Sequence, residues 1–155
     1  MLTHANLMST VVGGCIWAPT SSEAVGLGVL PMFHVTGMQA NMNIPIYLGA
    51  TTVLMTRWDR DTAAELIQRD RVTGVIGITT MIVDFLANPD LGTYDLTSIV
   101  RIGGGGAAMP EAVAAKMEKT LGMPFIEGYG LTETSAPSHS NPVHRPKRQC
   151  AGIPY

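Results

Sequence analysis

The chain has 155 residues, of which 46% are hydrophobic and only 14% are charged, and its formal net charge is −2. This length suits one ordinary domain, whereas charged residues usually make up about a quarter of a soluble domain. The low charge predicts a chain whose faces are covered by more protein. No basic stripe is present to follow a phosphate backbone, so we do not expect nucleic acid as a partner. The one dense basic run, at residues 144–148, lies among prolines and is expected to be a solvated loop.

The cysteines and the apolar runs indicate the cellular compartment. Cys15 and Cys150 are far apart, and no Cys-x-x-Cys pair or Cys/His cluster has the spacing of a zinc site. No apolar run is long enough for a transmembrane segment, and the first residues lack the pattern of a secretory signal. We therefore expect a cytoplasmic protein with two reduced thiols.

Apolar residues alternate along the chain between helical spacing and short strand-like runs. In chain order, these patterns predict a helix over 5–17, a strand over 24–30, a helix over 37–48, a strand over 51–55, a helix capped by Asp59, a strand over 75–78, a short helix through Met81 and Leu86, a strand over 99–102, a helix from Pro110 to Gly122 and a strand over 124–127. Pro45 is expected to bend or end the second of these helices, and Gly49 to cap it.

Strand–helix alternation at this spacing is typical of parallel β-α-β units. We therefore predict a layered α/β fold with a mostly parallel sheet, in a single unit covering residues 1–155. Ligands in such folds bind beyond the carboxyl ends of the strands. Two segments leave the expected strands at that place, Gly103–Gly106 and Gly128–Glu133.

The second segment has the residue types of a nucleotide site. Gly128 and Gly130 flank Tyr129, so the backbone can turn tightly and present a flat aromatic face to a purine. Thr132 offers a hydroxyl for a phosphate oxygen, and Glu133 offers a carboxylate for a hard cation such as Mg²⁺. The same residues also fit a plain Gly-x-Gly turn followed by the start of a helix. Spacing alone leaves both interpretations open.

Five segments, in order, resemble motifs of the adenylate-forming superfamily, which includes acyl-CoA synthetases. Gly128–Thr134 matches its Y-G-x-T-E motif, and Leu30–Gly37 resembles its P-x-F-H-x-x-G motif. Gly104–Pro110 resembles the glycine/alanine loop on the adenine side, Met1–Leu7 the stretch after the phosphate loop, and Ala151–Tyr155 the V-G-x-P segment. The resemblance covers the chain end to end and implies part of the large N-terminal domain of an acyl-CoA synthetase.

The resemblance also implies roles for individual residues. Tyr129 would stack on adenine, Thr132 would bind the α-phosphate and Glu133 would hold Mg²⁺, the last two being the catalytic residues. The nucleotide would be bound by Gly106, Ala107, Ala108, Gly128, Tyr129, Gly130 and Thr132. The acyl substrate would be bound by His34, Val35, Gly37, Gly104 and Leu131. His34 is expected to position substrate rather than transfer a proton, because an ionised carboxylate needs no general base.

The activity implied is that of an ATP-dependent acid–thiol ligase. A carboxylic acid, expected to be fatty, would react with ATP and then with coenzyme A to give acyl-CoA, AMP and pyrophosphate. The family's phosphate loop would lie before Met1, and its ribose-binding aspartate, hinge and C-terminal lysine domain beyond Tyr155. We therefore expect residues 1–155 alone to be inactive, and self-association of the isolated chain stays open.

Other functions stay open at this point. An aryl-CoA ligase, a luciferase-like oxygenase and a peptide-synthetase adenylation domain share the motifs, although the last needs an acidic anchor and no Asp lies near His34 or the glycine loop. A non-catalytic nucleotide-binding module is an alternative of a different class. A dinucleotide-binding domain ranks last, because Gly103–Gly106 is not a Gly-x-Gly-x-x-Gly that opens a first β-α unit.

Overall fold

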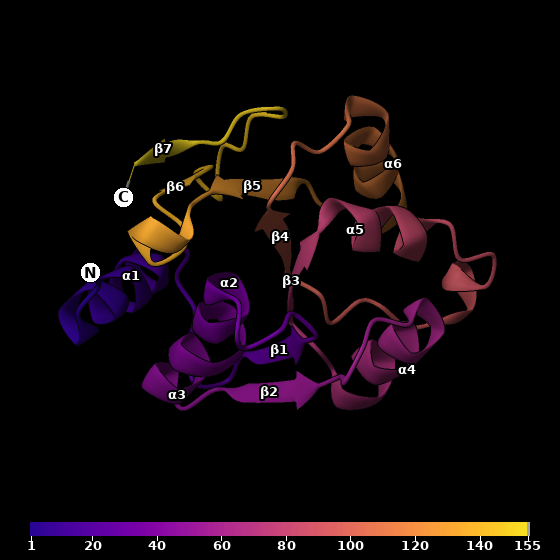
Figure 1. The fold of residues 1–155 in the computed structure, drawn as a ribbon. Helices are drawn as coiled ribbons and strands as arrows, with labels where there is room; N and C mark the ends of the chain where they lie inside the picture. The colour runs from indigo at the N-terminus through magenta and orange to yellow at the C-terminus, as the bar shows by residue number, and fades with distance from the viewer. Residues whose placement is uncertain (155) are drawn as a thin grey trace.

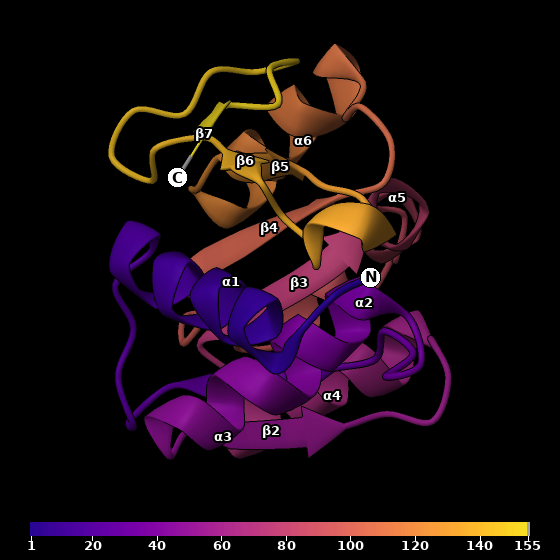
Figure 2. The same cartoon turned by 60° about the vertical axis from the view of Figure 1, so that its left-hand side comes forward.

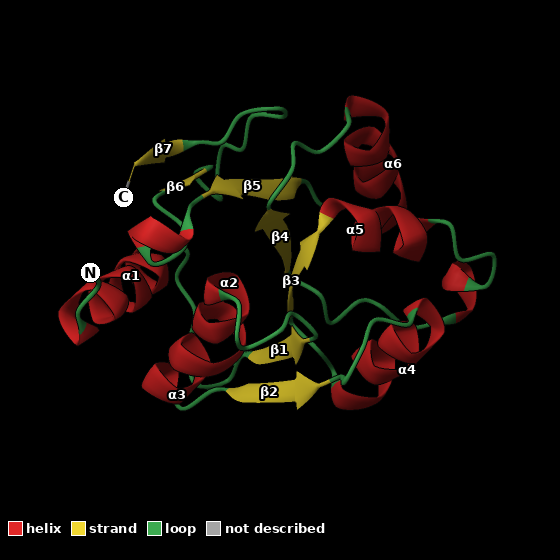
Figure 3. Ribbon diagram, viewed as in Figure 1, coloured by secondary structure: helices red, strands yellow, loops and turns green. Residues whose placement is uncertain are grey.

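A seven-stranded sheet runs through the computed structural model, which describes residues 1–154 (Figures 1 and 3). Its strand order is β2-β1-β3-β4-β5-β6-β7. The strands are β1 (Val25–Gly28), β2 (Thr51–Leu54), β3 (Gly74–Ile78), β4 (Arg101–Gly105), β5 (Phe125–Tyr129), β6 (His139–Ser140) and β7 (Ile153–Pro154). Strands β2, β1, β3, β4 and β5 are parallel, whereas β6 and β7 are short antiparallel additions. The predicted α/β class with a mostly parallel sheet is confirmed.

Helices cover both faces of this sheet. They are α1 (His4–Trp17), α2 (Val35–Gly37), the π-helix η1 (Met38–Asn43), α3 (Ile44–Leu48), α4 (Arg60–Asp70), α5 (Thr79–Leu86), the 3₁₀ turns η2 (Leu91–Thr93) and η3 (Thr132–Thr134), and α6 (Glu111–Leu121). In the strand order, the connection from β1 to β2 runs toward one edge of the sheet. The connections from β2 to β3, from β3 to β4 and from β4 to β5 run toward the other edge. Because crossovers are right-handed, this reversal puts α2, η1 and α3 on the face opposite α4, α5 and α6. Figure 2 shows α1, α2 and α3 in front of the sheet. No helix within residues 1–154 has the length and apolar content to span a membrane.

The main core lies between the sheet and α4, α5 and α6. Ile67, Phe85 and Met117 project from these helices onto Val75 and its neighbours, and all are buried. Helix α4 begins at the predicted cap, where the Asp59 carboxylate accepts a hydrogen bond from the Thr62 backbone N–H at 2.8 Å. Trp58 closes one end of this layer: its ring contacts Phe85 edge-on, and its indole N–H donates to Asp84 at 2.8 Å.

The helix expected over 37–48 continues through Pro45 rather than ending there. The segment is helical from Val35 to Leu48, with the π-helix η1 in its middle. A proline deprives the carbonyl four residues earlier of its amide partner. That carbonyl, of Asn41, accepts a hydrogen bond from the Thr52 hydroxyl instead, at 3.3 Å. The helix ends at Gly49, which adopts the left-handed conformation as predicted.

The strand expected over 99–102 is displaced. Strand β4 begins at Arg101 and takes in three glycines of the run that we expected to be a loop. Close packing of the backbones explains this difference, because a Cβ atom at Gly104 would lie 1.8 Å from the carbonyl oxygen of Gly77 on β3. The glycines therefore allow neighbouring strands to approach, and the loop starts only at Gly106.

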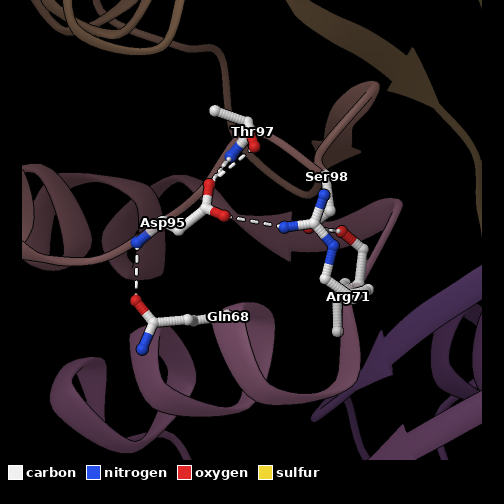
Figure 4. A network of polar contacts seen from close by, with 6 residues as sticks. Gln68, Arg71, Asp95, Thr97 and Ser98 are labelled. Atoms are coloured by element: carbon white, nitrogen blue, oxygen red, sulfur yellow. Dashed lines mark hydrogen bonds and ion pairs between the residues drawn. The ribbon is translucent and has the colours of Figure 1, made fainter.

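A polar network ties the loop before β4 to the C-terminal end of α4 (Figure 4). Arg71, in the left-handed conformation with φ of 54°, pairs with Asp95 at 2.7 Å. Asp95 also accepts hydrogen bonds from the Thr97 hydroxyl and backbone N–H, and its own backbone N–H donates to the Gln68 side chain at 2.7 Å. These contacts lie at the amino ends of the strands, which leaves the carboxyl ends free for a site.

Candidate functional site

The two segments singled out in the sequence leave the sheet side by side. Strands β4 and β5 are parallel neighbours, with Gly104 opposite Glu127 in the register. The chain leaves β4 at Gly106, where φ is +85°, and leaves β5 at Gly130. Both segments thus lie beyond the carboxyl ends of adjacent strands, where α/β folds place their ligands.

The glycine/alanine loop is exposed at Gly106, Ala107 and Ala108 but is held at two points. The hydroxyl of Thr79, the first residue of α5, donates to the carbonyl oxygen of Ala107 at 3.2 Å. The backbone N–H of buried Met109 donates to the Glu127 carboxylate at 2.9 Å. The loop therefore offers an open backbone surface with a fixed position.

Glu127 is a site residue that the sequence did not single out. Its side chain lies on β5 and is 7% exposed. One carboxylate oxygen accepts the Met109 N–H, and the other accepts the N–H of Gln149 at 2.8 Å. A carboxylate satisfied by backbone donors is stable in a buried position. Glu127 thus joins the glycine/alanine loop to the segment that leads into β7.

Asn141 completes this connection. It is 2% exposed, and its side chain donates to the carbonyl oxygens of Glu127 and Cys150 and accepts the N–H of Lys147. Its own carbonyl oxygen accepts the indole N–H of Trp17 at 3.2 Å. The basic run, residues 144–148, is thereby fixed as a surface loop next to α6. Its Arg148 pairs with acidic residues of that helix.

Tyr129 presents its ring at the end of β5. It is 48% exposed, and its ring meets that of His139 on β6 edge-on, with centroids 5.9 Å apart and an angle of 69° between the planes. The His139 ring nitrogen Nδ1 and the Ser138 hydroxyl lie 2.9 Å apart. Tyr129 is therefore supported along one edge and half open to a ligand.

Thr132 and Glu133 lie on the turn η3, within the loop that joins β5 to antiparallel β6. Both are exposed, and no ion pair of Glu133 is recorded within residues 1–154. A single free carboxylate suits Mg²⁺, which takes one or two protein carboxylates and completes its shell with water and phosphate oxygens. No group of three or more possible metal ligands occurs in the described chain, so a metal cage made of protein alone is not formed there.

The segment after β1 carries the expected acyl-pocket residues. His34 is exposed and caps α2, its Nδ1 accepting the N–H of Thr36 at 3.2 Å. Gly37 is buried, and a Cβ there would lie 2.1 Å from the carbonyl oxygen of Pro31. His34, Val35 and Leu131 lie on segments that follow the carboxyl ends of β1 and β5, whereas Gly104 lies inside the sheet.

Two cavities flank the sheet at opposite ends. A cavity of about 220 Å³ lies beside the η3 turn and is lined by Ser9, Thr10, Thr134, Pro137 and Ser138. A cavity of about 260 Å³ lies before β4 and β5 and is lined by Leu91, Gly92, Tyr94, Leu96, Thr97, Thr120 and Leu121. The smaller cavity is the one next to the candidate site, and its hydroxyl lining suits a polar group.

A family whose members are described as AMP-binding enzyme matches residues 1–155. The long-chain-fatty-acid–CoA ligase of Bacillus subtilis strain 168 is 36% identical over 143 residues, covering 91% of this chain and 26% of the relative. The 4-coumarate–CoA ligase-like 9 protein of Arabidopsis thaliana is 34% identical over 144 residues, covering 90% of this chain and 25% of the relative. The chain thus spans about a quarter of the length of these curated relatives.

Solved structures share the fold over nearly the whole chain. The O-succinylbenzoate coenzyme A synthetase of Bacillus subtilis, in complex with ATP and magnesium ion, superposes with a TM-score of 0.85 at 25% identity, covering 98% of this chain and 31% of that one. ATP-bound MatB from Rhodopseudomonas palustris superposes with a TM-score of 0.88 at 22% identity, covering 99% of this chain and 30% of that one.

Proposed function

The chain belongs to the AMP-binding enzyme family, and from this premise we propose that it forms the nucleotide-binding face of an AMP-forming acid–CoA ligase. The parent protein, meaning the full-length gene product that contains these residues, would make acyl-CoA from an acid, ATP and coenzyme A. The observation that carries the proposal is the exit of the glycine/alanine loop and the Gly128–Glu133 segment from adjacent strands. A nucleotide bound there would meet both segments at once.

Each exposed group at this edge has a chemical task in the proposal. The half-exposed ring of Tyr129 stacks on adenine, and the open backbone of Gly106–Ala108 lines the other side of the nucleotide. The Thr132 hydroxyl donates to an α-phosphate oxygen. Glu133 binds Mg²⁺, which supplies neutralisation of phosphate charge when bound. Gly128 and Gly130 allow the backbone to approach the ligand.

The reaction proposed has two halves. An oxygen of the carboxylate attacks the α-phosphorus of ATP, and pyrophosphate leaves. The thiolate of coenzyme A then attacks the acyl carbonyl carbon, and AMP leaves. The protein holds the anionic reactants in line and stabilises the charge that develops on phosphate, which accounts for most catalysis in phosphoryl-type transfers.

We propose a fatty or otherwise apolar acid as the substrate. Phe33 and Met32, beside His34, are 95% and 38% exposed at the carboxyl end of β1. The relative from Bacillus subtilis is named for long-chain fatty acids, which supports this choice. An aryl acid is the second candidate, since the Arabidopsis relative is named for 4-coumarate.

Acid-dependent exchange of labelled pyrophosphate into ATP tests the proposal directly. The purified parent protein is assayed with a panel of fatty, aryl and amino acids, with and without Mg²⁺. We expect exchange with apolar acids, dependence on Mg²⁺, and acyl-CoA formation once coenzyme A is added. Nucleotide binding without exchange for any acid would favour a non-catalytic module instead.

Residues 1–155 expressed alone are expected to form no acyl-CoA. The segments that follow the carboxyl ends of β1, β3, β4 and β5, residues 28–37, 78–80, 104–110 and 128–138, contain no Lys or Arg to face a triphosphate; Arg57 follows the edge strand β2, at the far side of the sheet from β5. Turnover by the isolated chain in a coupled thioester assay would refute this expectation.

A further inference from the structure

The turn that carries Thr132 and Glu133 is held in a costly conformation. Ser135 and Ala136, directly after it, have φ values of 64° and 62°, in the left-handed region that residues with a Cβ rarely adopt. The Ser135 hydroxyl is also buried without a hydrogen-bond partner, which adds a desolvation cost. Such costs persist only where the surrounding structure over-determines the conformation.

The side chain of Gln39, on the π-helix η1, binds this turn from a distant part of the chain. It is 2% exposed, and its Nε2 donates to the carbonyl oxygens of Ser135 and Leu7, both at 3.1 Å. Its Oε1 accepts a hydrogen bond from Asn43 at 2.7 Å, so every part of the amide is engaged. Within residues 1–154, the other side-chain bonds to the backbone of residues 131–136 come from Thr134 itself.

We propose that Gln39 is a positioning residue that fixes the orientation of Thr132 and Glu133. The inference rests on the function proposed above. Gln39 ties the carbonyl of Ser135 to that of Leu7 on α1, and the Ser135 N–H donates to the Thr132 carbonyl at 3.1 Å. Two hydrogen bonds, one from Gln39 to Ser135 and one from Ser135 to Thr132, therefore connect Gln39 to Thr132. Figure 2 shows this turn, in orange, lying above α2 and next to α1.

A purely structural role for Gln39 is the rival explanation, and Asn41 provides the matched control. Asn41 is on the same π-helix, is 5% exposed, and donates to the carbonyl oxygen of Leu30 at 2.9 Å. This hydrogen bond connects Asn41 to the segment before α2, and not to the turn that carries Thr132 and Glu133. Removing the Gln39 amide leaves the buried carbonyl of Ser135 without that donor, and removing the Asn41 amide does the same to the part-buried carbonyl of Leu30. Both changes should therefore destabilise the fold.

The test compares Gln39→Met with Asn41→Leu in the full parent protein by pyrophosphate exchange. For Gln39→Met we expect kcat to fall about tenfold, since small misplacements of reacting groups are costly. The Mg²⁺ concentration for half-maximal rate should rise, and the KM of the acid should stay within about twofold. For Asn41→Leu we expect a similar decrease in the thermal midpoint and an unchanged Mg²⁺ dependence. A kinetic effect of this variant should be confined to the KM of the acid.

A rescue variant separates the turn from the rest of the fold. Ser135→Gly removes both the Cβ that disfavours the left-handed conformation and the unpartnered hydroxyl. On its own it should keep kcat within about twofold, and combined with Gln39→Met it should restore most of the lost rate. If Gln39→Met does not fold, Gln39→Asn keeps an amide but shortens its reach to Ser135, and takes its place.

Hydrogen exchange without substrates gives a readout independent of activity. The amides of Thr134, Ser135 and Ala136 are bonded within the turn, and Gln39→Met should make them exchange faster while Asn41→Leu should not. Equal effects of both variants on exchange, kcat and Mg²⁺ dependence would overturn the inference and leave the proposed function standing. If none of the acids supports pyrophosphate exchange by the unaltered protein, the proposed function fails. Hydrogen exchange of the amides then still decides whether Gln39 fixes the turn.

Discussion

Glu127 and Gln39 are two buried polar side chains that connect segments far apart in the sequence. The carboxylate of Glu127 binds backbone N–H groups of the glycine/alanine loop and of the segment before β7. The amide of Gln39 binds carbonyl oxygens of α1 and of the η3 turn. Local pattern cannot reveal such roles, because their partners are backbone groups 18 to 96 positions away that bear no side-chain signature. By contrast, the residue types of Tyr129, Thr132 and Glu133 suggest a nucleotide site in the sequence, and the resemblance to the adenylate-forming superfamily supplies their expected roles.

Tyr129→Ala in the parent protein should raise the KM for ATP about tenfold, because stacking of a base on an aromatic ring contributes about 1–3 kcal/mol. Tyr129→Phe keeps the ring and should stay within about twofold of the unaltered enzyme. Steady-state exchange kinetics at varied ATP measure both. Equal KM values for the alanine and phenylalanine variants would mean that the ring does not stack on adenine.

At the scale of elements, periodicity predicted the helices and parallel strands but misplaced β4. Residues 103–105 were expected to lie in a loop because they belong to the glycine run that follows the strand-like residues 99–102. They form a strand because β3, β4 and β5 approach more closely than a side chain allows, which is a property of neighbouring strands rather than of the run itself. The continuation of the helix through Pro45 was missed for a similar reason, since the bond that compensates for the proline comes from Thr52 on β2.

Gly104→Ala should destabilise the parent protein by about 3 kcal/mol or more, because its Cβ would lie 1.8 Å from the Gly77 carbonyl oxygen and would force the strands apart. Gly74→Ala on β3 is the matched control, since its Cβ would meet nothing within 4 Å. We expect the control to be neutral or slightly stabilising. Thermal melts compare the two, and similar midpoints would contradict the close-packing explanation.

At the scale of the whole molecule, one face carries large exposed apolar side chains. Ile16 on α1 and Ile46 on α3 are 74% and 75% exposed, and Tyr47, the residue after Ile46, is 51% exposed. The two helices are in contact. Large exposed apolar side chains on two helices in contact are typical of an interface rather than of a face in water.

The isolated 155-residue chain should therefore self-associate, and Ile46→Lys should reduce the association. Val83→Lys is the control, because Val83 is also exposed, at 43%, but lies on α5, on the opposite face of the sheet. Light scattering coupled to gel filtration measures the mass of each form. A monomeric isolated chain, or equal effects of the two lysines, would show that this face does not drive association.

Stability should fall in acid because the pKa values of three aspartates are lowered in the folded state. A hydrogen bond from the Thr62 backbone N–H lowers the pKa of Asp59, hydrogen bonds from Arg69 lower that of Asp70, and those from Thr97 lower that of Asp95. A lowered folded pKa contributes stability above the unfolded value of about 4, and this is lost as the pH falls through the folded pKa.

Thermal melts of the parent protein from about pH 6 to about pH 3 should record this loss. Asp95→Asn removes the charge beside Arg71 in the network of Figure 4 but keeps an acceptor for Thr97. Its midpoint should lie below that of the unaltered protein at pH 6, and the two should converge as the pH falls. Parallel curves would mean that the Asp95 charge contributes nothing.

The chain's two tryptophans lie in different layers, so the fluorescence of each reports on the layer around it. Trp58 lies against Phe85 at the edge of the α4–α5 layer, whereas Trp17 donates to the carbonyl of Asn141 behind the site. A Trp58→Phe variant of the isolated chain would leave Trp17 as the sole source of tryptophan emission. Its wavelength in a denaturant titration would then follow the release of the α1–Asn141 contact separately from the melting of the main core.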